Sequence, residues 1–265
     1  MKLDQAQSLI GRHAVVTGGG RGLGVAIAEA LVQRGAAVSL IGRTAATLDS
    51  TAARLAAEHG ATVRTAVADV GDEASVAAAV ERCRAELGPA HIVVNNAGMA
   101  PSAPFLKSDA ALWRKTLDVD LMGAVHTTRA LLPDMLAAGW GRVINIASTA
   151  GLTGMAYVTA YCAAKHALVG FTRALAMEMA RKGITVNAVC PGYADTDIVG
   201  DTLANIVAKT GRSREEALAS LVGHNPQGRL IQPEEVGETV AWLCSGAAAS
   251  VTGQSIVLAG GELMP

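Results

Sequence analysis

HAVVTGGGRGLGVAIAEALVQR, residues 13–34, is the stretch that decides the fold of this chain. Its start, His13–Thr17, is an apolar run typical of a buried strand, and Gly22–Arg34 has the apolar spacing of a helix. Between them, the glycines of Thr17–Gly24 allow a sharp turn and a close approach of the backbone to a ligand. This order predicts the first βα unit of a parallel sheet, with an anion bound at the free N–H groups of the helix.

The same alternation of strand and helix continues along the chain. Short runs rich in Val and Ile predict strands near His13–Thr17, Ala37–Ile41, Thr62–Val67, His91–Asn95, Arg142–Ala147, Thr185–Cys190 and Ser255–Leu258. Longer segments of helical period predict helices near Gly22–Arg34, Thr44–Gly60, Asp72–Leu87, Ala110–Ala138, Thr159–Lys182 and Pro233–Cys244. We therefore predict an α/β fold: a single-domain, Rossmann-like, doubly wound parallel sheet of seven strands with helices on both faces.

The chain shows no linker or internal repeat, so residues 1–265 are expected to form one domain. Residues 1–10 form an N-terminal extension in this interpretation. Residues 193–228 interrupt the alternation and contain a helical piece, Asp201–Gly223. Because ligands of open parallel sheets bind beyond the carboxyl ends of the strands, this insertion is predicted to be a substrate lid.

Composition excludes several classes of function. The net charge is −1 and the basic residues are scattered, which argues against nucleic acid or a membrane surface as a partner. No apolar stretch reaches the roughly 18 residues that span a bilayer, and the start has no signal-peptide pattern, so we expect a cytoplasmic protein. The four cysteines and six histidines lack ligand spacing, which predicts buried free thiols and no metal site.

Three side chains have the spacing of an acid–base site. Tyr161 and Lys165 lie four residues apart on one face of a predicted helix, and Ser148 closes a strand thirteen residues earlier. Reduction of a carbonyl needs a proton donor, and a neighbouring ammonium should lower the pKa of a tyrosine toward neutral pH. Ser148 would hydrogen-bond the carbonyl oxygen as charge builds on it.

In this order, the motifs resemble those of the short-chain dehydrogenase/reductase family over roughly residues 10–262. The turn Thr17–Gly24 resembles its T-G-x-x-x-G-x-G pattern, Asn95–Gly98 its N-N-A-G turn, and Pro191–Thr196 its P-G-x-x-x-T segment. The resemblance implies an oxidoreductase that moves a hydride between a nicotinamide and a carbonyl or secondary alcohol carbon. It implies cofactor contacts from Thr17, Gly18, Arg21, Gly22, Leu23, Gly24, Arg43, Thr44, Asp69, Val70, Asn96, Ala97, Gly98, Tyr161, Lys165, Pro191, Gly192 and Thr196.

The choice of nicotinamide cofactor depends on the end of the second strand. A carboxylate there would bind the 2′-hydroxyl of NAD(H), but this chain has Arg43-Thr44. The guanidinium of Arg43, assisted by Arg21, can hold a 2′-phosphate, so NADP(H) is expected rather than NAD(H). The alternative is that Arg43 is a solvated loop residue.

One position departs from the family pattern. Asp120 stands where the resemblance implies an Asn, the fourth catalytic member, which positions a water that relays protons through the lysine. A carboxylate can still accept from that water, and beside Lys165 it could form a buried pair that weakens the effect of the lysine on Tyr161. We retain Asp120 with Ser148, Tyr161 and Lys165 as a catalytic residue.

Substrate and assembly follow from the resemblance. Segments from Asn225 to Gly261 look like those of 3-oxoacyl thioester reductases and 3-hydroxyacyl-CoA dehydrogenases, so a thioester of CoA or a carrier protein is the first expectation. A dehydrogenase of a cyclic alcohol, steroid or diol is the alternative, and a catalytically silent NADP(H)-binding sensor or scaffold is the alternative of another class. The expected partners are a small carbonyl or alcohol and further copies of the chain, in a homotetramer built on a four-helix bundle.

Overall fold

The computed structural model describes residues 9–264, and within them the predicted sheet is present. The strands are β1 (His13–Thr17), β2 (Ala37–Gly42), β3 (Val63–Val67), β4 (Ile92–Asn95), β5 (Gly141–Ile146), β6 (Ile184–Pro191) and β7 (Ser255–Leu258). They form one seven-stranded sheet in the order β3-β2-β1-β4-β5-β6-β7, and every neighbouring pair is parallel. The predicted fold class is confirmed. Of the expected N-terminal extension, residues 1–8 lie outside the described residues.

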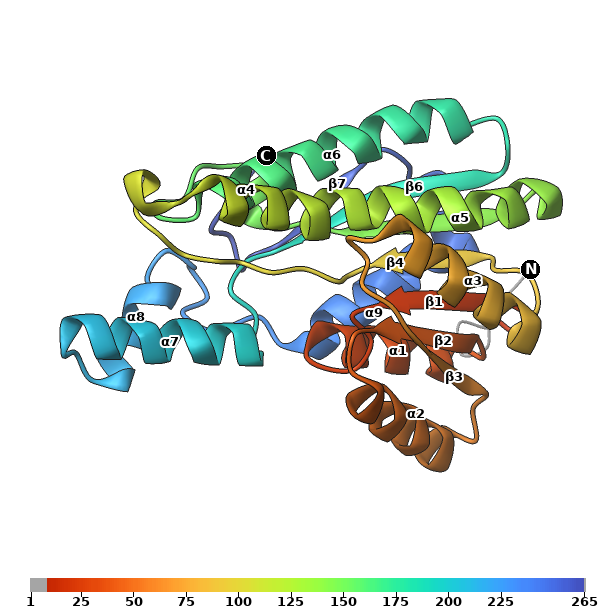
Figure 1. The fold of residues 1–265 in the computed structure, drawn as a ribbon, viewed down its shortest axis with the longest axis horizontal. Coiled ribbons are helices and arrows are strands. Elements are labelled where there is room, and N and C mark those ends of the chain that lie inside the picture. The colour runs from red at the N-terminus through yellow and green to blue at the C-terminus, as the bar shows by residue number, and fades with distance from the viewer. Residues whose placement is uncertain (1–8, 265) are drawn as a thin grey trace.

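Helices cover both faces of the sheet (Figure 1). They are α1 (Leu23–Gln33), α2 (Ala45–His59), α3 (Glu73–Leu87), α4 (Ala110–Leu117), α5 (Gly123–Ala138), α6 (Thr159–Met179), α7 (Asp197–Thr210), α8 (Arg214–Val222) and α9 (Pro233–Cys244). The first face carries α1, α2 and α9, and the second carries α3, α5 and α6, with α4 packed on α6. No helix within residues 9–264 has both the length and the apolar character needed to cross a bilayer.

The strands are apolar on both sides because successive side chains point to opposite faces. In β1, Val16 packs into the cluster that contains Ile27 and Leu31 of α1. Its neighbour Val15 packs into the other cluster, beside Val80 of α3. All residues of β1, β4, β5 and β6 are buried, which explains why these strands are continuous apolar runs in the sequence rather than alternating ones.

A buried polar network ties the centre of the sheet to two helices. The side-chain amide of Asn95 in β4 donates to the Asn145 carbonyl oxygen in β5 at 2.8 Å and to the Thr128 hydroxyl of α5 at 2.9 Å. The amide of Asn145 donates to the Thr172 hydroxyl of α6 at 2.8 Å. Buried polar groups are costly unless they are paired, so this network fixes α5 and α6 against the sheet in one register.

The predicted helix Ala110–Ala138 is interrupted in the structure. A π-helical turn, Asp118–Met122, separates α4 from α5 and contains the buried residue Asp120. Such turns are frequent at functional sites because they insert one extra residue into a helix. The apolar period alone did not reveal the insertion.

The predicted lid helix Asp201–Gly223 is two helices. It begins earlier, at Asp197, and breaks at Gly211, which has a left-handed backbone with φ 69°. Ser213 then starts α8 with a capping box that involves Glu216. Both helices extend away from the sheet (Figure 1), and they share a small apolar cluster of their own made of Val199, Leu203, Ala217 and Leu221.

The order in which strands are added to the sheet reverses between β1 and β4, which are parallel neighbours. One βα crossover series runs from β1 to β2 and β3, and the other runs from β4 to β7. In such sheets the crevice beyond the carboxyl ends of the two central strands binds the ligand. The predicted motifs lie at that edge.

Candidate active site

Several positions of the glycine turn after β1 have no room for a Cβ atom. A Cβ on Gly24 would lie 2.1 Å from the carbonyl oxygen of Gly18, so α1 approaches β1 as closely as backbone permits. Gly18 and Gly22 have positive φ angles of 66° and 53°. No side chain caps the start of α1 and its first turn has no acidic residue, so its amino end is free to meet an anion. These features fit the pyrophosphate of a dinucleotide.

The turn is joined to the motif after β4. The Thr17 hydroxyl accepts from the backbone N–H groups of Asn96 and Ala97 at 3.0 and 3.1 Å, and the Asn96 side-chain amide donates to the Thr17 carbonyl at 2.9 Å. A Cβ on Gly98 would lie 2.8 Å from an oxygen of Asp120, which explains a glycine there. The segment Asn96–Gly98 therefore connects the glycine turn to the buried charges described below.

Arg43 and Thr44 follow β2 at the same edge of the sheet. Thr17 is the register partner of Ile41, and a Cβ on Gly20 would lie 2.7 Å from the Thr47 hydroxyl at the start of α2. Arg43 is exposed and, within residues 9–264, makes no ion pair or hydrogen bond, as is also true of Arg21. Two unpaired guanidinium groups beside the turn suit a phosphate group.

Asp69 and Val70 follow β3. The Asp69 carboxylate accepts from the backbone N–H of Gly71 at 3.0 Å, an Asx turn that leaves further acceptor capacity. The carbonyl of Val70 lies 3.1 Å from the Nδ1 atom of His126, and the Val70 side chain is buried against Gly123. The local turn is thus structural, and the exposed carboxylate stays available at the crevice.

Pro191 to Thr196 closes the other side of the crevice. Pro191 pairs with Leu258 of β7, and the N–H of Gly192 donates to the Leu258 carbonyl at 2.9 Å. The Thr196 methyl group lies 3.5 Å from where a Cβ on Gly22 would be, so this segment faces the glycine turn. The structure therefore brings together the motifs from both ends of the sheet.

Ser148, Tyr161 and Lys165 converge at the carboxyl end of β5. Ser148 directly follows this strand region, and its hydroxyl accepts from the Ala150 N–H at 3.1 Å. The Ser148 hydroxyl is one of the groups that lower the pKa of the Tyr161 phenol. The Lys165 ammonium lies 5.5 Å from the centre of the Tyr161 ring. The three groups that the sequence singles out are therefore neighbours.

The Lys165 ammonium is buried and held by two oxygen acceptors. It donates to the Ile146 carbonyl at 2.9 Å and lies 3.2 Å from an oxygen of Asp120. The Asp120 carboxylate also accepts from the Met99 N–H at 3.3 and 3.2 Å to its two oxygens. The buried Asp120–Lys165 pair that the sequence suggested is present.

Burial has the largest effect on the pKa of Tyr161. Burial raises it above the ordinary value, while the Lys165 ammonium and the Ser148 hydrogen bond lower it only in part, and the Asp120 charge adds to the rise. Burial acts most strongly and lowers the pKa of Lys165, but the charges of Asp120 and Tyr161 and the hydrogen bond to Asp120 together outweigh it, and the pKa is raised. Lys165 lowers the pKa of Tyr161, as predicted. Burial has the larger effect, so the pKa of Tyr161 is raised overall.

Tyr157 has a strained backbone that the sequence did not reveal. It is the one non-glycine residue within residues 9–264 with positive φ, at 68°, and its side chain is 63% exposed. Its carbonyl accepts from the Ala103 N–H at 2.8 Å, which joins the loop after β4 to the loop after β5. Such strain persists only when its surroundings hold it, and it concentrates at functional sites.

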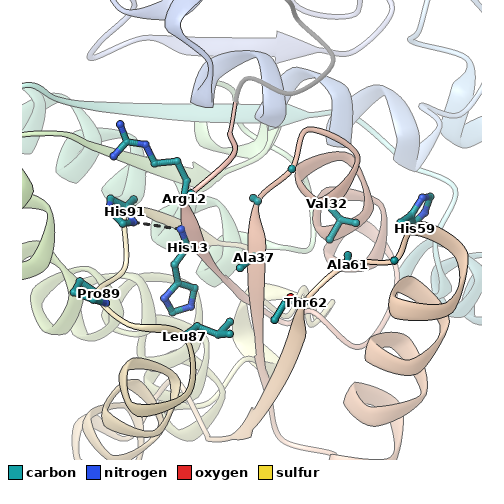
Figure 2. A pocket seen from close by; sticks show the side chains of 14 residues that line it. Arg12, His13, Val32, Ala37, His59, Ala61, Thr62, Leu87, Pro89 and His91 are labelled. Carbon is teal, nitrogen blue, oxygen red and sulfur yellow. Dashed lines mark hydrogen bonds between the residues drawn. The ribbon is translucent and has the colours of Figure 1, made fainter.

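A second hollow lies at the opposite, amino-terminal edge of the sheet (Figure 2). It has a volume of about 440 Å³ and includes Arg12, His13, His59 and His91 in its lining. The buried ring of His13 is fully engaged, with Nδ1 2.9 Å from the Gly88 carbonyl and Nε2 2.8 Å from the Ser39 hydroxyl. No convergent reactive groups occupy this hollow, so the crevice is the candidate site.

His59 also belongs to one group of possible metal ligands, with Glu29 and Glu58. Arg54 already pairs with both carboxylates, at 2.9 and 2.5 Å. The positive charge of its guanidinium would repel a cation there, and the group is largely exposed. We assign it a structural role.

Comparison with known proteins gives concordant results. The short chain dehydrogenase family model matches residues 12–206. The cis-4-hydroxycyclohexanecarboxylate dehydrogenase of Sinomonas cyclohexanicum is 42% identical, over 94% of this chain and 96% of that protein. A 3-oxoacyl-acyl-carrier-protein reductase of Pseudomonas aeruginosa is 40% identical, over 97% and 99%. Among solved structures, L-sorbose reductase of Gluconobacter frateurii with NADPH and L-sorbose has a TM-score of 0.93, 31% identity and coverage of 98% and 99%.

The buried pair predicts a large effect on stability. Asp120→Ala leaves the buried Lys165 ammonium without its carboxylate and should lower the free energy of unfolding by about 3 kcal/mol. Asp118→Ala, an exposed change in the same π-helical turn, should stay within about 0.5 kcal/mol of the parent. Urea unfolding followed by circular dichroism at equal protein concentrations measures both, and equal effects of the two changes would contradict the pairing.

Proposed function

The chain belongs to the short-chain dehydrogenase family of oxidoreductases, and from that premise we propose that it transfers a hydride between NADP(H) and a carbonyl or secondary alcohol carbon. The observation that carries the proposal is the convergence of Ser148, Tyr161 and Lys165 beside the glycine turn. Two solved relatives, L-sorbose reductase and a variant of actinorhodin polyketide ketoreductase (TM-score 0.91, 36% identity), contain NADPH.

We expect the residues of the motifs to hold the cofactor. The turn Thr17–Gly24 and the start of α1 would take the pyrophosphate, and Arg43 with Arg21 would take the 2′-phosphate. Asp69 and the segment Asn96–Gly98 would line the adenosine side. Pro191, Gly192 and Thr196 would meet the nicotinamide end. When bound, the reduced nicotinamide supplies the hydride.

In the direction of reduction, Tyr161 would donate its phenolic proton to the carbonyl oxygen as the carbon is reduced. The Ser148 hydroxyl would donate a hydrogen bond to the same oxygen and stabilise its developing negative charge. Lys165 would favour the phenolate that remains on Tyr161. Asp120 would hold the Lys165 ammonium in place and, because it is an anion, offset part of that electrostatic effect.

For the substrate, we propose a 3-oxoacyl or 3-hydroxyacyl thioester. The similarity to the acyl-carrier-protein reductase of Pseudomonas aeruginosa supports this. Lys209, Arg212 and Arg214, on and between α7 and α8, are exposed and make no ion pair within residues 9–264, so they are free to meet the phosphates of a carrier. Residues 193–228 would act as the lid over the acyl chain.

A cyclic alcohol is the second candidate. The cyclohexanecarboxylate dehydrogenase is slightly more similar to this chain than the carrier-protein reductase is. The partly buried apolar side chains near the site, Leu152 and Tyr193 among them, suit a ring as well as an acyl chain.

The location that we propose is the cytoplasm. Its support is that Cys83, Cys162, Cys190 and Cys244 are all free, and free thiols persist in reducing compartments. Three are buried as expected, whereas Cys162 is partly exposed.

Turnover tests the proposed reaction. NADPH oxidation is followed with 3-oxoacyl thioesters, cyclohexanones and ketoses as substrates. Tyr161→Phe should lower kcat by about 10³-fold with the substrate that the parent reduces best, because the proton donor is lost. NADPH affinity, measured by fluorescence titration, should change little. NADPH binding without turnover of any substrate would favour the silent sensor instead.

Cofactor choice tests Arg43. Loss of charge-assisted hydrogen bonds to a 2′-phosphate should make Arg43→Gln lower kcat/KM for NADPH by about 10- to 100-fold, with little change for NADH. Arg82→Gln, which removes the same charge from α3, is the matched control. A parent enzyme that prefers NADH would refute the assignment.

Assembly is the remaining part of the proposal, and we propose a homotetramer. Three large apolar side chains on or beside α5 and α6 are exposed. Met122, just before α5, is 37% exposed, Leu136 in α5 is 39% exposed, and Met177 in α6 is 82% exposed. Such exposed apolar side chains suit a four-helix contact between two copies. Trp242 of α9 is 40% exposed and offers a second contact. Light scattering should give about four times the mass of one chain, and a monomer would contradict it.

A further inference from the structure

Glu262 is a carboxylate at the candidate site that none of the motifs includes. It lies just after β7, and its Oε2 atom is 3.2 Å from where a Cβ on Gly192 would be. Gly192 follows β6, which is the neighbour of β5 in the sheet. The carboxylate therefore lies at the same edge of the sheet as Ser148.

Tyr193 connects this carboxylate to the reactive groups. Tyr193 directly follows Gly192 in the chain; burial raises the pKa of its phenol, and the charges of Glu262 and Tyr161 both add to the rise. Tyr193 also packs against the apolar cluster of α7 and α8. Tyr193 therefore lies next to the contact between Gly192 and Glu262, on the side of the lid helices.

The position of Glu262 is fixed by the backbone around it. Its N–H donates to the Ala259 carbonyl at 3.0 Å. The preceding Gly260 and Gly261 pack on the end of the lid segment: a Cβ on Gly260 would lie 2.0 Å from the Asn225 oxygen, and one on Gly261 3.2 Å from Pro226. Both glycines have positive φ. The backbone that carries the carboxylate is therefore held against the end of the lid segment.

Glu262 has no partner to neutralise it within residues 9–264. Its carboxylate makes no hydrogen bond or ion pair there. Partial burial raises its pKa, and His224, exposed after α8, is the basic group whose charge opposes that rise. A half-buried acceptor without a donor in the protein is available to a donor on a ligand.

Building on the proposed function, we infer that Glu262 determines substrate specificity by accepting a hydrogen bond from a hydroxyl or ammonium group on the substrate and by disfavouring substrates with a carboxylate. The reactive carbonyl would lie at Ser148 and Tyr161, and the donor group would lie on the far side of Tyr193. Polyols satisfy both parts of this rule and neutral thioesters satisfy the second, whereas free oxo acids satisfy neither.

The test compares three cyclohexanones that differ only at the ring carbon opposite the carbonyl, which bears an ethyl, a hydroxymethyl or a carboxylate group. Calorimetry gives the Kd of each for the protein with and without NADP+, and turnover with NADPH is measured in parallel. In Glu262→Gln, the carboxylate compound should bind about tenfold more tightly relative to the ethyl compound, because a like charge is removed at short range. The preference for hydroxymethyl over ethyl should fall severalfold.

Glu234→Gln, the same change at an exposed residue of α9, is the matched control and should leave both ratios unaltered. Unaltered ratios in Glu262→Gln, or no binding of any of the three compounds to the parent, would overturn the inference. Turnover is the independent readout: a shift in the binding ratios without turnover would leave the role of Glu262 intact and refute the proposed oxidoreductase activity.

Discussion

The buried ammonium of Lys165 is the interaction on which the rest of the site depends. It is charged inside the protein only because the Ile146 carbonyl and the Asp120 carboxylate compensate for the lost water. Ile146 belongs to β5, Asp120 to the π-helical turn and Lys165 to α6, so the three elements must pack together before the charge is tolerated. The packing of the fold and the electrostatics at Tyr161 are therefore set by the same contacts.

Much of this arrangement could be predicted from the sequence because strong local patterns and global packing agree. Strands buried on both faces are continuous apolar runs, and glycines occur where backbone meets backbone, as at Gly24 against Gly18. The spacing of Tyr161 and Lys165 on one helix, with Ser148 at a strand end, was enough to place the three groups together. The Asp120–Lys165 contact could also be predicted, because the family pattern places the residue at position 120 beside the lysine.

Other features depend on information that no local pattern carries. The net direction of the Tyr161 pKa is set by the degree of burial, which outweighs the lysine that the sequence made visible. The left-handed backbone at Tyr157 could not be predicted, because a glycine is the usual sequence signal for that conformation and this position is a tyrosine. Glu262 lies beyond the last recognisable motif and reaches the crevice only through the pairing of β7 with β6. The break between α7 and α8 did have a signal, the capping-box pattern Ser213 to Glu216, which the longer helical period obscured.

The π-helical turn has a geometric consequence for the two helices that it joins. One extra residue rotates everything after it by about 100° around the common axis, since an α-helix has 3.6 residues per turn. The apolar stripe of α4 is thus out of phase with that of α5. α4 packs on α6 while α5 packs on α3 and the sheet, so one nearly continuous rod serves two different neighbours. The same rotation turns the side chain of Asp120 toward the interior. In an uninterrupted helix, this side chain would lie on another face of the helix.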